Sequence, residues 1–448
     1  MNIDLGNIMR ESTIDNLIDG DFQLPTINKV EDTGLSALWL QDHILKVLYY
    51  QGYLSGFSIA EEIALPFTGV VDGIMETLKR DKLVEVKSSQ LGIGEGSYVY
   101  GITNAGTIRA REALDRNQYA GPVPVPLDTY YKACIQQNKG RLRINDKILN
   151  QALSHLVLPD DVYQKLGPAI NSGTSIFLYG PPGDGKTSVG HAIGKIVMGR
   201  PIYIPYAIYV DGMVIKLYDS GHHQLLDESK KSTPASNSNF GKANIDARWL
   251  KIKRPFIVVG GELTLEGLDL IYDNINKYYE APFQVKANGG VLLIDDFGRQ
   301  LVRPRDLLNR WIVPLDSRVD YLTMHTGKKI EIPFDVMVLF ATNLPPKDLV
   351  DEAFLRRLRH KIELTDPDFD VYREIFLRIA KQKSIKYNDE VLAYLLQEWY
   401  IKQKRKLRAS HPRDICDQIL DISNYLSIEP VMSRELIDRA AESFFVKL

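Results

Sequence analysis

Apolar residues in the N-terminal quarter of the chain recur first with helical spacing and then with strand spacing. Residues 35–50, 59–65 and 68–80 show the helical spacing and predict three short helices. Residues 83–87 and 98–102 flank a glycine-rich turn and predict a β-hairpin. This part of the sequence therefore predicts a small helical unit that closes with a hairpin.

The middle of the chain alternates between apolar strand patterns and helical patterns. The strand candidates are short apolar runs at Ile176–Tyr179, Ile202–Tyr209, Phe256–Val259, Val291–Ile294 and Val336–Ala341. Helical patterns lie between several of them, which favours a parallel sheet covered by helices and an α/β fold class. Turn residues predict two further hairpins, one at Asp211-Gly212 and one at Thr326-Gly327.

Strand patterns stop near residue 368, and four helical patterns follow. They cover residues 369–383, 388–403, 411–426 and 432–446. The run Gly121-Pro122-Val123-Pro124-Val125-Pro126 predicts an extended spacer, and residues 227–242, rich in Ser, Asn and Lys, predict a surface loop. The expected organisation is an N-terminal arm (1–34), a unit of helices and a hairpin (35–120), a proline-rich linker (121–139), an α/β domain (140–367) and a helical domain (368–448).

Composition narrows the classes of protein that fit. Among 448 residues, 55 Lys and Arg balance 57 Asp and Glu, which excludes a polycationic nucleic-acid coat and a long acidic tail. The two cysteines, Cys134 and Cys416, cannot form a disulfide framework or a structural zinc site, so we expect a reducing, cytoplasmic location. No apolar run approaches the ~18 residues of a membrane span, so we expect no membrane insertion.

Residues 180–187 carry the strongest chemical signal. The sequence Gly180-Pro181-Pro182-Gly183-Asp184-Gly185-Lys186-Thr187 fits the P-loop pattern G-x-x-x-x-G-K-[ST], after a predicted strand and before a predicted helix. Glycines let backbone N–H groups approach phosphate oxygens, and the following helix N-terminus favours an anion. We expect this loop and Ser188 to bind a nucleotide, with Lys186 at its β- and γ-phosphates and the Thr187 hydroxyl on Mg²⁺.

Carboxylates at the end of a later strand suit the same chemistry. Val291–Ile294 is followed directly by Asp295 and Asp296. Asp295 is expected to hold Mg²⁺, directly or through water, and Asp296 to orient or deprotonate the attacking water. A further apolar strand ends in Asn343.

The order of these motifs resembles that of AAA+ ATPases. The P-loop is followed by a Walker B strand ending at Asp295-Asp296, a sensor-1 position at Asn343, an arginine-finger segment at residues 352–358 and a sensor-2 position in His411-Pro412-Arg413-Asp414-Ile415. The resemblance covers roughly residues 140–448. It implies a P-loop αβα domain with a C-terminal helical lid, and ATP bound between the two.

The resemblance also implies roles for individual residues. Asn343 is expected to contact the γ-phosphate or the lytic water, and Arg413 to act as sensor 2 from the lid. The finger is Arg356 or Arg357, with Arg357 favoured because it directly precedes the apolar Leu358. Since a finger arginine acts on the ATP of a neighbouring subunit, the resemblance implies a homo-oligomer, usually a ring of six.

The resemblance to one clade of AAA+ proteins rests on the hairpin predicted between Asp296 and Asn343. It is similar to the pre-sensor-1 hairpin clade, which includes MoxR-like ATPases, and we favour a MoxR-like placement. One departure is that Asp296 stands where the family usually has Glu. The shorter side chain displaces the carboxylate by ~1 Å, a misplacement that can cost ~100-fold in rate, so slow hydrolysis or an ATP switch stays open.

The N-terminal unit resembles a winged helix, a fold often used to bind DNA. Residues 37–115 nevertheless carry three more acidic than basic residues, and the third helix has Asp72 and Glu76 along its body. We therefore favour docking of a protein partner over DNA. The basic run at residues 402–408 is interpreted as a solvated helix end, with contact to nucleic acid or an acidic partner as the alternative.

These observations favour an ATPase that couples ATP binding and hydrolysis to the remodelling of a protein partner, as a chaperone does. A DNA-directed AAA+ protein, such as a transcriptional activator or initiator, is the second hypothesis. A slow-hydrolysing ATP switch is the third.

Overall fold

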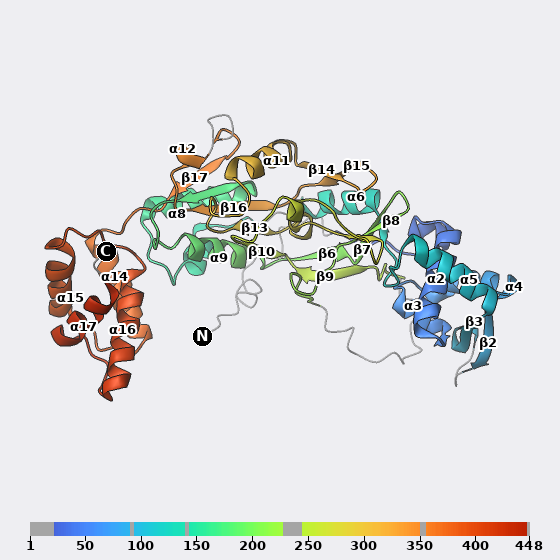
Figure 1. Ribbon diagram of the computed structural model, residues 1–448, viewed down its shortest axis with the longest axis horizontal. Coiled ribbons are helices and arrows are strands. Elements are labelled where there is room, and N and C mark those ends of the chain that lie inside the picture. The colour runs from blue at the N-terminus through green and yellow to red at the C-terminus, as the bar shows by residue number, and fades with distance from the viewer. Residues whose placement is uncertain (1–21, 90–93, 139–142, 227–243, 350–354, 446–448) are drawn as a thin grey trace.

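The chain is elongated, with a parallel sheet in its middle, a domain of helices and a small sheet at one end and a helical bundle at the other (Figure 1). The computed structural model describes residues 22–89, 94–138, 143–226, 244–349 and 355–445. The predicted surface loop at residues 227–242 lies outside these ranges, as do residues 1–21 of the expected arm. No helix in the described ranges has both the length and the apolar character that crossing a membrane requires.

The central sheet has five parallel strands in the order β10-β13-β16-β5-β17. Its strands are β5 (Ile176–Tyr179), β10 (Phe256–Val259), β13 (Val291–Ile294), β16 (Met337–Thr342) and β17 (His360–Glu363). The first four were predicted within a residue of these bounds, whereas β17 was not predicted. Its short apolar content, with only Ile362 fully buried, explains why it escaped the pattern.

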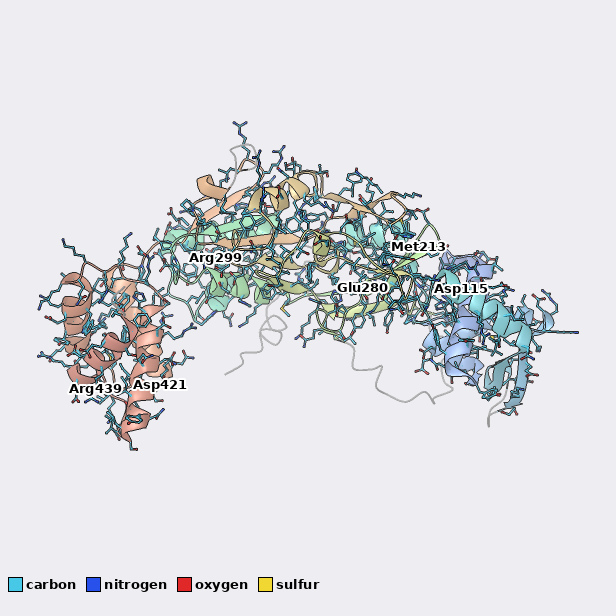
Figure 2. All side chains as sticks on the ribbon, viewed as in Figure 1. Asp115, Met213, Glu280, Arg299, Asp421 and Arg439 are labelled. Atoms are coloured by element: carbon cyan, nitrogen blue, oxygen red, sulfur yellow. The ribbon has the colours of Figure 1, made fainter. Side chains whose placement is uncertain are left out.

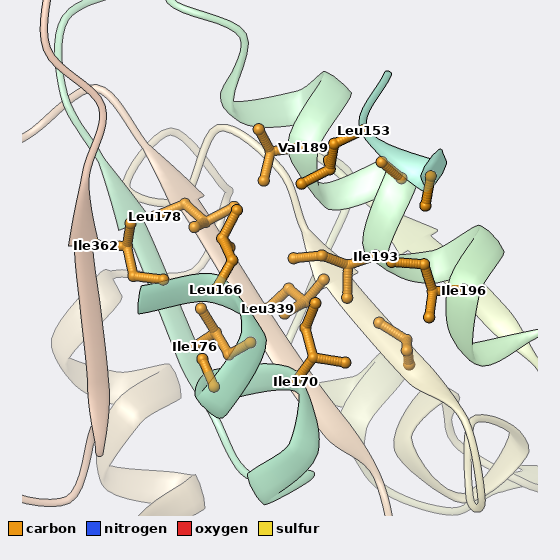
Figure 3. Packing of buried hydrophobic residues seen from close by; sticks show 14 of the residues in the cluster. Leu153, Leu166, Ile170, Ile176, Leu178, Val189, Ile193, Ile196, Leu339 and Ile362 are labelled. Atoms are coloured by element: carbon orange, nitrogen blue, oxygen red, sulfur yellow. The ribbon is translucent and has the colours of Figure 1, made fainter. Parts of the chain in front are cut away.

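Side chains along each strand alternate between two buried faces. Leu178, Leu293 and Leu339 point into one cluster, whereas their neighbours Phe177 and Leu292 belong to another. The first face is covered by α7 (Asp146–Ala152), α8 (Asp160–Ser172) and α9 (Lys186–Val197), as Figure 3 shows for Leu166, Ile170, Val189 and Ile193. The second is covered by α11 (Pro304–Ser317) through Leu307, Leu308 and Trp311. This arrangement is the αβα sandwich expected from the sequence, and two-sided burial is why its strands read as continuous apolar runs.

A second, mixed sheet extends the body away from the parallel sheet. Its strand order is β11-β12-β8-β7-β4, and the strands are β4 (Val125–Pro126), β7 (Ala207–Val210), β8 (Met213–Lys216), β11 (Ile271–Asp273) and β12 (Tyr278–Glu280). Two antiparallel ribbons accompany it, β6 (Pro201–Pro205) with β9 (Trp249–Lys253), and β14 (Val319–Thr323) with β15 (Lys329–Pro333). Both predicted hairpins are confirmed, and positive φ values at Asp211 (49°) and Gly212 (82°) form the tight turn between β7 and β8.

The proline-rich segment is part of this body, which corrects the linker expected at residues 121–139. Val123 and Val125 are fully buried, and β4 pairs in parallel with β7. Helix α6 (Leu127–Asn138) then places Tyr130 in the core of the second sheet. The prolines do set an extended backbone, but the valines between them are apolar enough to be buried, so the segment does not behave as a spacer.

The N-terminal domain contains the predicted three helices and hairpin. Its elements are α2 (Ala37–Gln51), β1 (Leu54–Ser55), α3 (Gly56–Glu62), a π-turn (Phe67–Val71) that leads into α4 (Asp72–Arg80), β2 (Val84–Ser89), β3 (Tyr98–Ile102) and α5 (Asn104–Arg116). The strands form one antiparallel sheet in the order β1-β3-β2. Residues of the expected arm join this core too, since Ile27 is fully buried in it.

The N-terminal domain docks firmly on the second sheet. Arg248 is 2% exposed, forms a two-bond ion pair with Asp246, and donates to the carbonyl oxygens of Thr33 and Pro124. The Lys277 ammonium donates to the Asp115 carbonyl oxygen at 2.7 Å. Figure 2 shows Asp115 at the end of the molecule that adjoins Met213 and Glu280 of the second sheet. The N-terminal domain, which is the candidate for binding a partner, is therefore packed against the second sheet and is not joined to it by a spacer alone.

The C-terminal helical domain has its own core. It consists of α14 (Phe369–Gln382), α15 (Asp389–Leu395) continued by a π-turn (Leu396–Ile401), α16 (His411–Leu426) and α17 (Arg434–Phe444). Tyr372, Phe376, Tyr400, Ile415 and Ile419 are among its buried residues. The four predicted helices are confirmed. Shorter helical elements elsewhere are η1 (Val30–Thr33), η3 (Glu95–Ser97), η5 (Glu266–Leu268), α10 (Phe283–Lys286) and α12 (Pro346–Leu349).

Candidate functional site

The predicted site residues from three strands gather at the carboxyl edge of the parallel sheet. The P-loop follows β5, Asp295 and Asp296 follow β13, and Asn343 follows β16. After β5 the chain crosses to β10 at the edge of the sheet and returns through β13 to β16, and it then places β17 on the other side of β5. Such a switch in strand order opens a crevice at the carboxyl ends, where ligands of open α/β sheets bind.

The P-loop adopts backbone angles that its glycines permit. Gly180, Gly183 and Gly185 have φ values of 143°, 87° and 84°. A Cβ at Gly180 would lie 2.0 Å from the Leu364 carbonyl oxygen, so only glycine fits there. Helix α9 starts directly after Gly185, and the N–H groups of its first turn, at Lys186, Thr187 and Ser188, have no acceptor within the helix. The loop thus directs free donors toward the crevice.

Lys186 is folded against its own loop. Its ammonium donates to the carbonyl oxygens of Gly180 at 3.0 Å and Pro181 at 2.5 Å. Burial lowers the pKa of Lys186, whereas the carboxylates of Asp184, Asp296 and Asp295 act in the opposite direction. These three acids surround the lysine with negative charge, which favours the cationic form that a polyphosphate needs.

Thr187 and Asp295 form the first pair of residues brought together from distant positions. The Thr187 hydroxyl lies 3.0 Å from each Asp295 carboxylate oxygen. A hydroxyl and a carboxylate are hard oxygen donors, the kind that Mg²⁺ prefers, and Mg²⁺ usually takes few protein ligands alongside phosphate oxygens and water. The donor set therefore fits the magnesium ion expected from the sequence.

Asp296 and Asn343 form the second pair. The Asn343 side-chain amide donates to Asp296 Oδ1 at 3.2 Å. Asp296 itself has a φ of 49°, in the left-handed region that residues other than glycine seldom adopt. The carboxylate expected to handle water and the amide expected to sense phosphate are thus in direct contact.

The helical domain reaches the P-loop through a residue that was not among the predicted site residues. Arg408 Nη1 lies 3.4 Å from Asp184 Oδ2 and also pairs with Asp366. The Ala409 N–H donates to Asp184 Oδ1 at 3.3 Å, and Ser410 lies against Gly183. Burial raises the pKa of Asp184, and the Ala409 N–H, Arg408 and Lys186 oppose that rise.

The basic run at residues 402–408 is therefore not a uniformly solvated helix end. Arg408 is drawn inward by two acids, and the Arg405 guanidinium stacks over Phe445 at 4.3 Å. Lys402 pairs with Glu398 across one helical turn. Charge composition alone could not distinguish these roles, because the acids that engage Arg408 lie more than 40 residues away in the sequence.

The remaining predicted residues lie around this site with less direct contact to it. Arg413 is exposed in the first turn of α16. Arg357 Nε donates to Asp316 of α11 at 2.7 Å, and Arg356 is exposed beside it. The finger segment before Leu355 lies outside the described residues. Arg299, three residues after Asp296, lies on the side of the body toward the helical domain (Figure 2).

Comparison with known proteins gives the following matches. A family model described as "Domain of unknown function (DUF8689)" matches residues 368–443, which make up the C-terminal helical domain. No curated protein matches the sequence of this chain.

Among solved structures, NtrX from Brucella abortus in complex with ADP is 15% identical, with a TM-score of 0.39, and the match covers 64% of this chain and 56% of that one. NtrX in complex with ATP is 14% identical, with a TM-score of 0.37 and coverages of 70% and 60%. A RuvB mutant from Thermotoga maritima is 13% identical, with a TM-score of 0.40 and coverages of 67% and 74%. The chain thus spans little more than half the length of the NtrX chains it matches.

Proposed function

We propose that this protein is an ATPase of the AAA+ type, which binds ATP with Mg²⁺ at the P-loop and hydrolyses it. The observation that carries the proposal is the pairing of Thr187 with Asp295 at 3.0 Å, beside the pairing of Asp296 with Asn343 at 3.2 Å. These four residues come from three segments of the chain, one of them the P-loop, and the fold brings them together at one edge of the sheet. A chance glycine-rich turn has no such surroundings.

Each group has a task in phosphoryl transfer. The α9 N-terminal N–H groups and Lys186 hold the phosphates, and Asp296 accepts the proton of the attacking water. Asn343 orients that water or the γ-phosphate through the same amide that touches Asp296. Thr187 and Asp295 would hold Mg²⁺, which would supply positive charge to offset the negative charge that develops on the phosphates.

We further propose a ring, with six subunits as the expected number. Arg357 donates to Asp316 of α11 in its own chain at 2.7 Å, and we propose that it acts on the ATP of a neighbouring subunit. Arg356 remains the alternative. The β14–β15 hairpin between Asp296 and Asn343 supports the placement near MoxR-like ATPases, and a cytoplasmic location stays a prediction.

A protein is the partner that the N-terminal, winged-helix-like domain suits best. Of its basic residues, Lys46 is 3% exposed, Arg109 pairs with Asp42 at 2.8 Å, and Lys87 pairs with Glu85 at 2.6 Å. The outward face of α4 carries Glu76. Binding to DNA needs several lysines or arginines that neutralise phosphates. Lys79, Arg80 and Lys82 at the end of α4 are exposed, but residues 37–115 carry three more acidic than basic residues. We therefore propose remodelling of a protein partner.

ATPase assays test the proposal directly. Lys186→Ala should abolish ATP binding, whereas Lys195→Ala, an exposed lysine on the same helix, should leave it unchanged. Asp296→Asn should retain ATP and lose at least ~100-fold in turnover, whereas Glu331→Gln on the exposed side of β15 should not. Equal ATP binding by Lys186→Ala and Lys195→Ala would refute the site.

The same assays separate the other two hypotheses. Stimulation of turnover by double-stranded DNA, lost as salt rises, would favour a DNA-directed protein. Tight ATP binding with turnover no faster in the wild type than in Asp296→Asn would favour the ATP switch. A pull-down with Asp296→Asn, which should hold ATP and trap its partner, identifies the protein that is remodelled.

A further inference from the structure

Asp295 and Asp296 lie in a turn whose backbone conformation is uncommon for residues other than glycine. Asp296 has a φ of 49°, and Gly298, two residues later, has a φ of 106°. A non-glycine residue keeps such a conformation only where the surrounding structure imposes it. The contacts that impose it are therefore contacts that place the Asp296 carboxylate.

Two hydrogen bonds from β16 hold the backbone of Phe297, the residue after Asp296. The Phe297 N–H donates to the Ala341 carbonyl oxygen at 2.7 Å. The Thr342 hydroxyl donates to the Phe297 carbonyl oxygen at 2.6 Å. Both polar groups of this residue are thus taken up by consecutive residues of one strand.

The Thr342 hydroxyl also forms a hydrogen bond within its own segment of the chain. It accepts a hydrogen bond from the Leu344 N–H at 3.1 Å, which spans Asn343. Thr342 is 1% exposed, so water cannot replace either bond. One buried hydroxyl therefore joins the turn that bears Asp296 to the segment that bears Asn343.

Gln300 supports the same turn from its other side. Its side-chain amide donates to the Asp295 carbonyl oxygen at 2.8 Å and accepts from the Gly298 N–H at 2.7 Å. Gln300 has no bond to the Asn343 segment among the contacts described. It stiffens the turn, whereas Thr342 sets where the turn lies relative to Asn343.

We propose that Thr342 is a positioning residue for ATP hydrolysis, whose hydroxyl holds Asp296 and Asn343 in the relative placement that the hydrolytic step requires. This role rests on the proposed ATPase function. Thr342 has no role in holding the nucleotide, because its hydroxyl is buried and both of its bonds are to backbone groups. Its removal should therefore affect kcat and leave ATP affinity intact.

The chain offers a closely matched control in Thr33, far away in the N-terminal part. Thr33 is also 1% exposed, and its hydroxyl donates to the Val30 carbonyl oxygen at 2.6 Å and accepts from the Leu35 N–H at 3.1 Å. Thr33→Val and Thr342→Val therefore remove the same pair of bonds from equally buried sites. Any general loss of stability is common to both.

The experiment measures kcat, the Kd for Mg·ATP and the melting temperature of the full chain for Thr342→Val, Thr342→Ser and Thr33→Val. We expect Thr342→Val to lose about 10- to 100-fold in kcat, with Kd within about twofold of the wild type. Thr342→Ser, which keeps the hydroxyl, should restore kcat to within about threefold, and Thr33→Val should leave it unchanged.

Three results would overturn the role. Equal kcat for Thr342→Val and Thr33→Val would show that the hydroxyl does not position the site. A parallel loss of kcat and ATP affinity, or no recovery with serine, would assign Thr342 to general folding of the loop. If the wild type binds Mg·ATP without turnover, the proposed hydrolysis itself is wrong, and the role of Thr342 with it. This outcome is distinct from the first two, in which the wild type does hydrolyse ATP.

Discussion

Arg408 of the helical domain lies 3.4 Å from Asp184 of the P-loop, and the Asp184 side chain is 1% exposed. A buried carboxylate in a phosphate-binding loop repels the anion that the loop is built to hold. Arg408 offsets that charge, and because it lies beyond the last strand of the sheet, it makes the helical domain part of the electrostatics of the site.

The first prediction concerns this pair. Arg408→Gln removes the cation beside Asp184 and should weaken Mg·ATP binding about tenfold, or about 1.4 kcal/mol. Isothermal titration of the two proteins measures the change. Lys406→Gln is the control, since Lys406 also neighbours Asp366, at 3.6 Å, and its side chain is 75% exposed. Equal affinities for the two variants would show that Arg408 has no influence on the loop.

The second prediction concerns the arginine finger. Arg357→Ala should lower kcat by about 10³–10⁵, whereas Arg356→Ala should lower it less than about tenfold. A mixture of Arg357→Ala with Lys186→Ala should regain turnover, because one subunit then supplies an intact P-loop and its neighbour an intact finger. Recovery only with the Arg356→Ala variant would move the role to Arg356. No recovery with either would argue against action between subunits.

The third prediction concerns the buried Arg248–Asp246 pair, which joins the segment around Thr33 to Pro124 and the second sheet. Arg248→Met leaves Asp246 buried without its cation and should cost about 3–5 kcal/mol in the free energy of unfolding. Denaturant titration measures this loss. Arg305→Met, at an exposed position, should change the free energy of unfolding by no more than about 0.5 kcal/mol. Similar losses for Arg248→Met and Arg305→Met would show that the buried pair does not hold these segments together.

The fourth prediction concerns pH. Burial, with Lys46 nearby, lowers the pKa of His43 from 6.5 to about 3. Its Nε2–H donates to the Gly121 carbonyl oxygen, and its buried Nδ1 has no hydrogen-bond partner among the described residues. The unfolded chain takes up a proton below about pH 6.5 while the folded protein does not. Stability therefore falls as pH drops from 6.5 toward 3, by up to about 1.4 kcal/mol per pH unit from this group.

Comparison with His43→Gln isolates that contribution. The variant keeps a donor for the Gly121 carbonyl oxygen but does not titrate, so its stability should vary less between pH 6.5 and 5. The lowered pKa of Lys46, about 7, affects stability above this range and leaves the comparison intact. Identical pH profiles for the wild type and His43→Gln would contradict the assignment.

Local sequence patterns predicted which residues gather at the candidate nucleotide site. The P-loop is contiguous, and Asp295, Asp296 and Asn343 each end a strand whose two buried faces make it uniformly apolar. Once parallel strands were expected, their carboxyl ends had to meet at one edge. The structure adds the contacts between them, Thr187 with Asp295 and Asp296 with Asn343.

Other contacts could not be predicted from the neighbouring residues in the sequence. Nothing near Arg408 distinguishes it from the other cations of its run, because Asp184 and Asp366 belong to the preceding α/β domain. Thr342 reads as one more strand residue, and its partner Phe297 lies 45 positions earlier. The proline-rich segment reads as a spacer until β7 is present to pair with β4.

By itself, the sequence determined which residues are candidates for the chemistry and which segments form most of the strands and helices, since these depend on side-chain type and spacing within a few residues. Tertiary structure alone decided that the N-terminal domain is clamped to the second sheet, that Arg408 joins the P-loop and that Thr342 links Asp296 to Asn343. Each of these depends on burial and pairing between residues distant in the chain, where the loss of water makes a single hydrogen bond or ion pair decisive.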